Sequence, residues 1–143
     1  MGSREKRNKN RGSLGNNRKA AEEFLSKNRS KPDVMETSSG LQYILIEEGT
    51  GSFPDAHSTV VIHQRCSLVN GKVIEDTYKE NKPDEVSMDE LIKGYREGMM
   101  LMKKGGRSRF FVPTDLAWGK KGSGGKIPPN ALLIFDVRLI DFW

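Results

Sequence analysis

The hydrophobic pattern from Ser87 to Gly106 predicts an amphipathic helix. Apolar residues recur there at the spacing of one helix face, beginning with Leu91 and Tyr95. Ser87 and Glu90, three residues apart, fit a capping box at the N-terminal end, and the pattern allows a break near Lys93. A helix this short is not stable alone, so its stability must come from the elements that surround it.

Gly94 and Gly98 lie one turn apart in this predicted helix. Each glycine costs up to about 1 kcal/mol of helix propensity relative to alanine. We therefore expect these two positions to let a sheet approach the helix backbone closely.

The other hydrophobic segments alternate with a period of two residues, which is typical of half-buried strands. This pattern predicts strands at residues 41–48, 59–69, 72–75, 107–113 and 132–142. Asn70-Gly71 favours a tight hairpin turn, and residues 85–87 can pair briefly before the helix. We assign five residues of the last two strands to the core: Phe110, Phe111, Leu133, Val137 and Leu139.

A long loop rich in glycine and proline separates the last two strands, from Thr114 to Asn130. Loops of this length inside a compact domain are usually functional or mobile. One helix crossing an antiparallel sheet gives an α+β roll, with the helix in the concave face of the sheet.

Positive charge is concentrated at the N-terminal end. Through Pro32 the chain has ten Lys or Arg against three Glu, or +7, and the remainder has fourteen against sixteen acidic residues, or −2. Residues 1–17 have almost no apolar side chains, which predicts a disordered basic arm. Residues 18–39 are expected to form a linker with a short, loosely docked helix near residues 17–28, followed by one domain at residues 40–143.

Two interpretations of the basic arm stay open. It can be a solvated tail, or it can make contacts with RNA or ribosomes that depend on salt and not on base sequence. No aromatic residue is present in it to stack on bases.

The amino-acid composition indicates in which cellular compartment the protein is expected. Hydrophobic residues make up 35% of the chain and charged residues 30%, and no apolar run approaches the length of a membrane span. The single Cys66 excludes an internal disulfide. We expect a cytoplasmic protein without membrane contact, with a periplasmic location as the alternative if a signal peptide has been removed. Cys66 and His63 are expected to be structural, and His57 to be exposed.

Six motifs follow one another in a characteristic order: VVIHQR at 60–65, GKVIEDT at 71–77, NKP at 81–83, LIKGYREGMMLMKKGGR at 91–107, VPTDLAWG at 112–119 and IPPNALLIFDVRLI at 127–140. Together they resemble the FKBP-type peptidyl-prolyl cis-trans isomerases, the FK506-binding immunophilins, from about Gly40 to Trp143. The resemblance implies a five- or six-stranded antiparallel sheet wrapped around one short helix. It also implies an apolar pocket between helix and sheet, closed by the loop before Ile127, and no cofactor or metal.

The activity implied by the resemblance is rotation about the peptide bond that precedes proline, which assists protein folding. The barrier is roughly 18–20 kcal/mol because the C–N bond has partial double-bond character. An apolar site that removes water from the carbonyl and fits the twisted amide lowers this barrier without an acid or a base.

The resemblance assigns ten residues to the pocket. The catalytic group is Glu75, Ile92, Tyr95, Trp118 and Phe135. The substrate-binding group is Gln64, Ile74, Val86, Leu91 and Ile127. The backbone N–H of Ile92 is expected to donate to a carbonyl of the bound chain, and Lys120, Lys121 and Lys126 to give the loop over the pocket a positive rim.

Five of these positions depart from the residue that the family usually has. Tyr95 stands in place of Trp, Trp118 and Gln64 in place of Tyr, Ile74 in place of Phe, and Glu75 in place of Asp. We expect a reshaped pocket, with reduced isomerase activity on Pro-containing polypeptides and weakened affinity for FK506-like macrolides. The alternative is a weakly catalytic or non-catalytic, chaperone-like binding module for Pro-containing segments.

Overall fold

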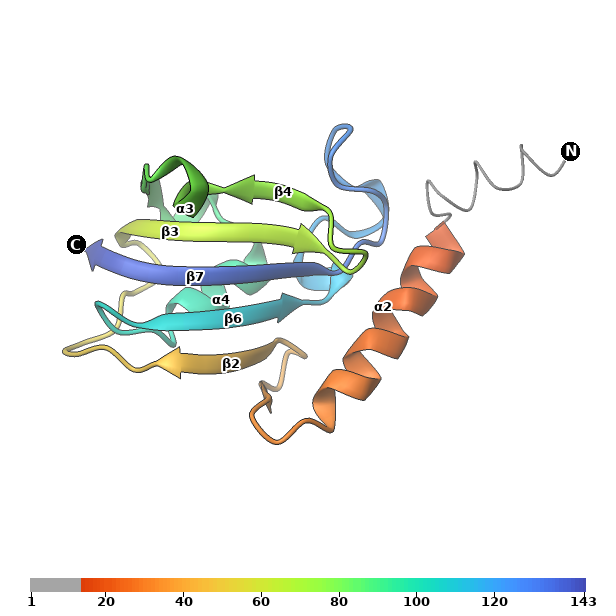
Figure 1. Ribbon diagram of the computed structural model, residues 1–143, viewed down its shortest axis with the longest axis horizontal. Helices are drawn as coiled ribbons and strands as arrows, with labels where there is room; N and C mark the ends of the chain where they lie inside the picture. Colours follow the sequence, from red (N-terminus) through yellow and green to blue (C-terminus); the bar gives the residue numbers. More distant parts are fainter. Residues whose placement is uncertain (1–13) are drawn as a thin grey trace, which may run out of the picture.

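One antiparallel sheet curves around a central helix in the computed structural model, which describes residues 14–143 (Figure 1). The sheet has seven strands in the order β1-β2-β6-β7-β3-β4, with β5 paired to β3 outside this path. The strands are β1 (Met35–Glu36), β2 (Gln42–Glu47), β3 (Thr59–Leu68), β4 (Val73–Asp76), β5 (Asp84–Ser87), β6 (Arg107–Val112) and β7 (Leu133–Phe142). The helices are α2 (Leu14–Arg29), α3 (Thr77–Glu80) and α4 (Lys93–Met99), with 3-10 turns η1 (Met88–Glu90), η2 (Thr114–Leu116) and η3 (Gly119–Lys121).

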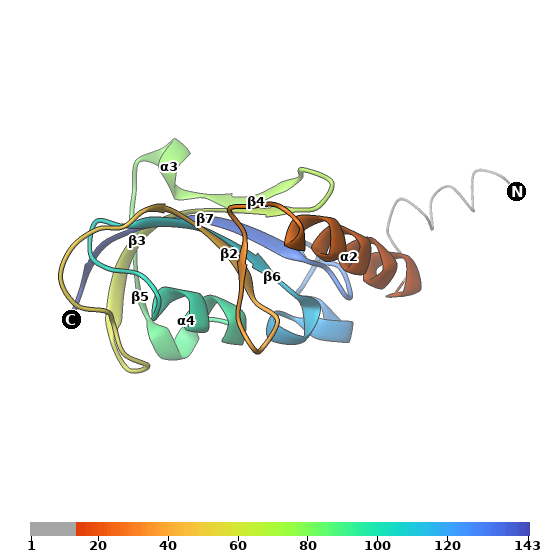
Figure 2. The same cartoon turned by 90° about the horizontal axis from the view of Figure 1, so that it is seen from below.

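The α+β architecture predicted from the sequence is confirmed. Figure 2 shows the sheet arching over α4, so that its concave face and the helix enclose the core. The strand count differs from the expected five or six, because β1 adds a two-residue strand from the predicted linker; it pairs Met35 with Tyr43 and Glu36 with Gln42. None of the helices within residues 14–143 combines the length and apolar character needed to span a membrane.

Strands β3 and β7 form the centre of the sheet. They pair antiparallel from Val60 opposite Phe142 to Leu68 opposite Leu133. Side chains of β3 alternate between buried and more exposed positions along all ten residues, as expected for a strand that presents one face to the core and the other outward.

The predicted helix is too long, whereas the break that the pattern allows near Lys93 is confirmed. Met88–Glu90 form a 3-10 turn, Leu91 is extended, and α4 begins only at Lys93 and ends at Met99. Ser87 does act as a cap, but its Oγ accepts from the Asp89 N–H at 3.3 Å and so caps the 3-10 turn. The apolar spacing predicted one continuous helix because residues of the 3-10 turn and of α4 both pack on the same core. Their apolar positions therefore have the spacing of a single helix face.

The expected close approach between α4 and the sheet is confirmed. A Cβ atom built on Gly94 would lie 2.5 Å from Val112 Cγ1, and one on Gly98 would lie 2.7 Å from Phe110 Cε1. Real Cβ atoms do not approach other atoms so closely, so only glycine lets the α4 backbone rest directly on β6.

The predicted core residues are all buried, but they belong to two layers. Phe110, Leu133, Val137 and Leu139 join the central cluster between α4 and the sheet. Phe111 is also buried, at 5% exposure, but it lies outside this cluster and packs against Phe24 of α2, with ring centroids 5.8 Å apart. Consecutive strand residues face opposite sides, so Phe111 needs its own cover on the outer face.

Helix α2 supplies that cover and is firmly docked, so the expectation of loose docking was wrong. Asn28 is 1% exposed and its Nδ2 donates to Gln42 Oε1 at 2.8 Å. Gln42 Nε2 donates in turn to Leu25 O at 3.1 Å and to Glu36 Oε2 at 3.0 Å. A buried amide pair of this kind holds its partners in place, because leaving either amide unsatisfied costs about 1–3 kcal/mol.

The helix also begins earlier than expected. It starts at Leu14, inside the arm that the sequence predicts to be disordered at residues 1–17. The rest of that prediction falls on residues 1–13, which lie outside the described part of the chain.

Candidate active site

A cavity of about 570 Å³ lies between the concave face of the sheet, the segment that leads into α4 and the loop before β7. Its lining contains all ten residues assigned to the pocket from the sequence: Gln64, Ile74, Glu75, Val86, Leu91, Ile92, Tyr95, Trp118, Ile127 and Phe135. The chain therefore brings these residues together in one place, although they come from seven separate segments.

Two aromatic rings form the floor of the cavity. Tyr95 is 3% exposed and Phe135 is 6% exposed, and their ring centroids lie 4.3 Å apart in a tilted arrangement. Tilted pairs at this distance are favourable beyond their burial, because the ring edge of one meets the face of the other. Trp118 differs from this pair, because it is 46% exposed and stands at the rim.

Extended backbone places two apolar walls. Leu91 and Ile92 lie between η1 and α4 in β-type conformation, with ψ angles of 148° and 155°. Within residues 14–143 the backbone N–H of Ile92 has no hydrogen-bond partner in the chain. A free donor beside an apolar cavity is suited to binding a carbonyl oxygen of a ligand.

Gln64 connects three polar groups at one wall. Its Oε1 accepts a hydrogen bond from the Tyr95 hydroxyl at 2.9 Å, and its Nε2 donates to Glu75 Oε2 at 3.2 Å and to Asp84 Oδ2 at 3.1 Å. Both N–H groups and the oxygen of the amide are engaged, which fixes its orientation. The resemblance to the family led us to expect a departure from an aromatic wall here, and this chain has a partly buried polar bridge across β3, β4 and β5.

Burial raises the pKa of two protonatable groups that line the cavity, the Tyr95 phenol and the Cys66 thiol. It raises the pKa of the Tyr95 phenol well above its usual value, with Cys66 and the carboxylates of Asp84 and Glu75 adding to the effect. Burial, with a further contribution from Glu75, also raises the pKa of the Cys66 thiol to about 12. The site therefore presents a neutral phenol and a neutral thiol at pH 7, and neither can act as a proton shuttle there.

The loop over the cavity is folded back on itself. Ser123 N–H donates to Ile127 O at 2.8 Å and Ile127 N–H donates to Ser123 O at 3.1 Å. Gly122 has φ of 66°, and a Cβ on it would lie 2.3 Å from Ile127 O, so this turn requires glycine. Lys126 lines the cavity, whereas Lys120 and Lys121 lie in η3 outside it; the positive rim therefore rests on Lys126.

The sequence analysis missed several residues of the cavity lining and one residue that fixes its polar wall. Cys66 and Leu133 line the cavity, and Asp84 fixes Gln64 from β5. Cys66 follows Gln64 by two residues on β3 and Leu133 precedes Phe135 by two on β7, so strand alternation could have placed both on the same face. Asp84 carried no comparable signal, because its contact depends on how β5 pairs with β3.

The histidine and cysteine predictions are confirmed. His63 Nδ1 lies 3.0 Å from Thr77 Oγ1, and its ring stacks on Tyr78 with centroids 5.0 Å apart. His57 is exposed. Cys66 is buried at 3% exposure.

The comparisons with known proteins agree with this geometry. The family model described as FKBP-type peptidyl-prolyl cis-trans isomerase matches residues 50–140. The chain belongs to this family. A second model, described as the domain amino terminal to FKBP-type peptidyl-prolyl isomerase, matches residues 2–45. The segment before the FKBP domain is therefore similar to the segment that precedes this domain in other family members.

Curated relatives and solved structures extend the match. Outer membrane protein MIP of Legionella longbeachae is 40% identical over 124 residues, which is 87% of this chain and 53% of that protein. The FKBP-type peptidyl-prolyl cis-trans isomerase FkpA of Escherichia coli K12 is 37% identical over 125 residues, which is 87% of this chain and 46% of that protein. The chain thus spans about half the length of the curated relatives it matches.

Two crystal structures share the fold. The crystal structure of FkpA from Escherichia coli has a TM-score of 0.87 at 36% identity and covers 90% of this chain and 60% of that one. A peptidyl-prolyl cis-trans isomerase from Pseudomonas syringae has a TM-score of 0.84 at 28% identity and covers 92% of this chain and 96% of that one.

Proposed function

We propose that this FKBP-type domain catalyses cis-trans isomerisation of peptide bonds that precede proline in polypeptide substrates. The observation that carries the proposal is the apolar cavity of about 570 Å³ with a free backbone donor at Ile92 on its wall. The proline ring would rest on the floor formed by Tyr95 and Phe135. The preceding carbonyl would turn toward the Ile92 N–H.

The rate enhancement would come from the environment of the amide. Planar amide resonance separates charge, which water stabilises, so moving the bond into an apolar cavity weakens the planar form relative to the twisted one. Tyr95 and Cys66 are neutral at pH 7, and burial raises both pKa values further, so neither side chain adds a charge that would favour the planar dipole. Glu75, held by Gln64 at the rim, would orient the substrate backbone.

We further propose that the activity is lower than that of family members with a fully aromatic pocket. Gln64 and Ile74 stand where the family usually has Tyr and Phe, and the Gln64 amide brings the carboxylates of Glu75 and Asp84 to the wall. Two charged carboxylates next to the cavity draw water toward it, which opposes the desolvation that the reaction requires.

A protease-coupled assay on peptides that vary the residue before proline tests the activity. Trp118 and Trp143 offer a matched pair, because both are exposed and only Trp118 lines the cavity. Trp118→Ala should lower kcat/KM roughly tenfold, whereas Trp143→Ala should change it by no more than about twofold. Equal effects of the two substitutions on kcat/KM, or no acceleration of isomerisation by the unaltered chain, would refute the proposal.

The reduced activity has its own test. Ile74→Phe restores an aromatic wall and should raise kcat/KM several-fold, while Ile46→Phe, at an exposed position outside the cavity, should leave it unchanged. A wild-type kcat/KM equal to that of an FKBP with a fully aromatic pocket would contradict the idea, as would a lower value for Ile74→Phe.

The binding-module alternative is decided by the same measurements. A chain that binds Pro-containing peptides in titrations without accelerating isomerisation would be a holding module. The polar wall at Gln64 also leads us to propose weakened affinity for FK506-like macrolides, measurable by displacement of such a ligand.

The names of the relatives bear on where the protein is located. The Legionella relative is named an outer membrane protein, which favours the periplasmic alternative for this chain, and no relative named above supports the cytoplasmic prediction. Contact with RNA or ribosomes is one of the two interpretations of the arm at residues 1–17, of which residues 1–13 lie outside the described part of the chain; the comparisons give it no support.

A further inference from the structure

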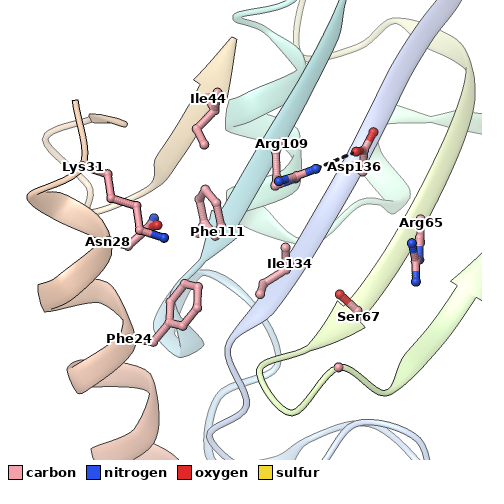
Figure 3. Close-up of a pocket in the computed structure, with 11 residues that line it drawn as sticks. Phe24, Asn28, Lys31, Ile44, Arg65, Ser67, Arg109, Phe111, Ile134 and Asp136 are labelled. Atoms are coloured by element: carbon pink, nitrogen blue, oxygen red, sulfur yellow. Dashed lines mark hydrogen bonds and ion pairs between the residues drawn. The ribbon is translucent and has the colours of Figure 1, made fainter. Parts of the chain in front are cut away.

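A second cavity, of about 390 Å³, lies on the opposite side of the sheet, between the outer sheet face and helix α2 (Figure 3). Strand alternation separates it from the isomerase pocket: Gln64 and Cys66 line the pocket, whereas Arg65 and Ser67 line this groove. On β7, Phe135 lines the pocket and Ile134 lines the groove. We call it the α2 groove.

The floor of the α2 groove is apolar. Phe24 of α2 lies against Phe111 of β6, and Ile44 and Ile134 flank them from the neighbouring strands (Figure 3). Phe24, Ile44 and Ile134 are only half-buried, so part of this surface remains open to a partner. Covering this floor with an apolar side chain removes apolar surface from water, which stabilises the complex.

Cations surround this floor. Lys31, Arg65 and Arg109 line the groove, and Asp136 is the one carboxylate among its lining residues. Arg107, outside the groove, already holds both oxygens of Asp136 at 2.9 Å, and Arg109 adds a third bond at 3.3 Å. The groove is therefore left with more positive charge than its own carboxylate neutralises.

Two of the cations are only weakly engaged. Arg65 reaches Asp76 with one contact of 3.9 Å, and Lys31 forms no ion pair with any residue in the range 14–143. Both side chains are exposed. They can turn toward a ligand carboxylate without losing a strong interaction inside the protein.

The groove is also preformed. The buried amide pair of Asn28 and Gln42 fixes α2 against the sheet, and Asn28 itself lines the groove. A partner would not have to order the helix before binding, which removes part of the entropic cost of association.

We propose that the α2 groove binds an acidic polypeptide segment in which aromatic or aliphatic residues stand next to Asp or Glu. The apolar side chains would cover Phe24 and Ile134, and the carboxylates would pair with Lys31, Arg65 and Arg109. Arginine forks match the carboxylate geometry. Nucleic acid fits less well, because the Asp136 carboxylate lines the groove and would repel a phosphate.

Fluorescence polarisation with a labelled, proline-free decapeptide that alternates Glu and Phe tests the proposal. Absence of proline keeps the probe from acting as an isomerase substrate. The test variant is Lys31→Gln combined with Arg65→Gln. The control is Lys19→Gln combined with Lys82→Gln, which removes the same charge at two exposed lysines outside both cavities.

The test variant should weaken binding roughly tenfold, and raising the salt concentration should weaken wild-type binding. The control should bind like wild type, and both variants should keep the wild-type rate on proline peptides. A peptide of glutamate alone should bind more weakly, since it cannot cover the floor. Equal loss in test and control, equal affinity for the glutamate peptide, no saturable binding, or tighter binding of a single-stranded oligonucleotide through the same residues would each overturn the proposal.

Discussion

The hydrogen bond between Tyr95 and Gln64 allows a sharp test of how the polar wall is held together. Both residues are buried, at 3% and 8% exposure, and the hydroxyl lies 2.9 Å from the amide oxygen. Tyr95→Phe removes one oxygen and leaves the ring, so it creates almost no cavity. It leaves the Gln64 oxygen without its donor in a buried site, which costs about 1–3 kcal/mol.

Urea unfolding should therefore show a loss of about 1–3 kcal/mol for Tyr95→Phe, with a melting temperature lower by roughly 3–10 °C. In a Gln64→Leu background the same substitution should cost about 1 kcal/mol less, because the acceptor is already gone. The cycle isolates this hydrogen bond from the general effect of altering the wall.

The pH dependence has a defined sign. Burial raises the pKa of Tyr95 well above its usual value, so its contribution to stability is complete below the pKa of an unfolded tyrosine, about 10, and is lost as the pH rises further. The cost of Tyr95→Phe should be constant from pH 6 to 9 and shrink above pH 10. Because the ring and not the hydroxyl forms the proposed floor, kcat/KM should stay within about threefold of wild type.

An equal cost of Tyr95→Phe in the two backgrounds would refute the assignment of this hydrogen bond. So would a cost below about 0.3 kcal/mol, which is within the range of unrelated surface changes.

Three further predictions concern the core and the outer face. Gly98→Ala should destabilise the fold by about 1–2 kcal/mol net, because the clash with the buried Phe110 ring at 2.7 Å outweighs the gain in helix propensity; denaturation that shows a stabilised variant would contradict this. Cys66, whose pKa is raised to about 12, should react with iodoacetamide at pH 8 roughly a thousandfold more slowly than a free cysteine, and a rate within about tenfold of the free thiol would speak against a buried thiol. Burial alone would raise the pKa of Asp136, but hydrogen bonds from Arg107 and Arg109 lower it overall. Arg107→Gln should thus cost about 1–3 kcal/mol at pH 7, and the difference from wild type should vanish as the pH falls below about 4 and through the folded-state pKa; a difference that persists at pH 2 would point to packing instead.

The sequence predicted the sheet well because strand alternation is a local signal. The segments at residues 59–69 and 132–142 became β3 (Thr59–Leu68) and β7 (Leu133–Phe142) almost unchanged. The helix was predicted at the right place and at too great a length, because apolar spacing reports which residues meet the core and not whether the backbone between them is helical. Leu91 meets that core from an extended conformation.

The ten pocket residues came from the family resemblance, and the structure brings them to one cavity. No sequence pattern predicted the hydrogen-bonded bridge through Gln64. Its three partners come from different segments, and their contacts depend on β3 pairing with both β4 and β5. Similarly, the docking of α2 could be predicted only if Phe111 was known to lie on the outer face of the sheet. There the ring is covered by α2, through Phe24.

Strand β3 shows why the two proposed sites can function independently. Its inward residue Gln64 forms the polar wall of the isomerase pocket, and its outward neighbour Arg65 belongs to the α2 groove. The two side chains point to opposite faces of a sheet that is anchored by long pairing with β7, so a substitution at one face need not displace the other. A polypeptide held in the α2 groove by its acidic residues would therefore stay bound while a proline elsewhere in the same chain enters and leaves the pocket, which raises the local concentration of that proline without any change in the pocket itself.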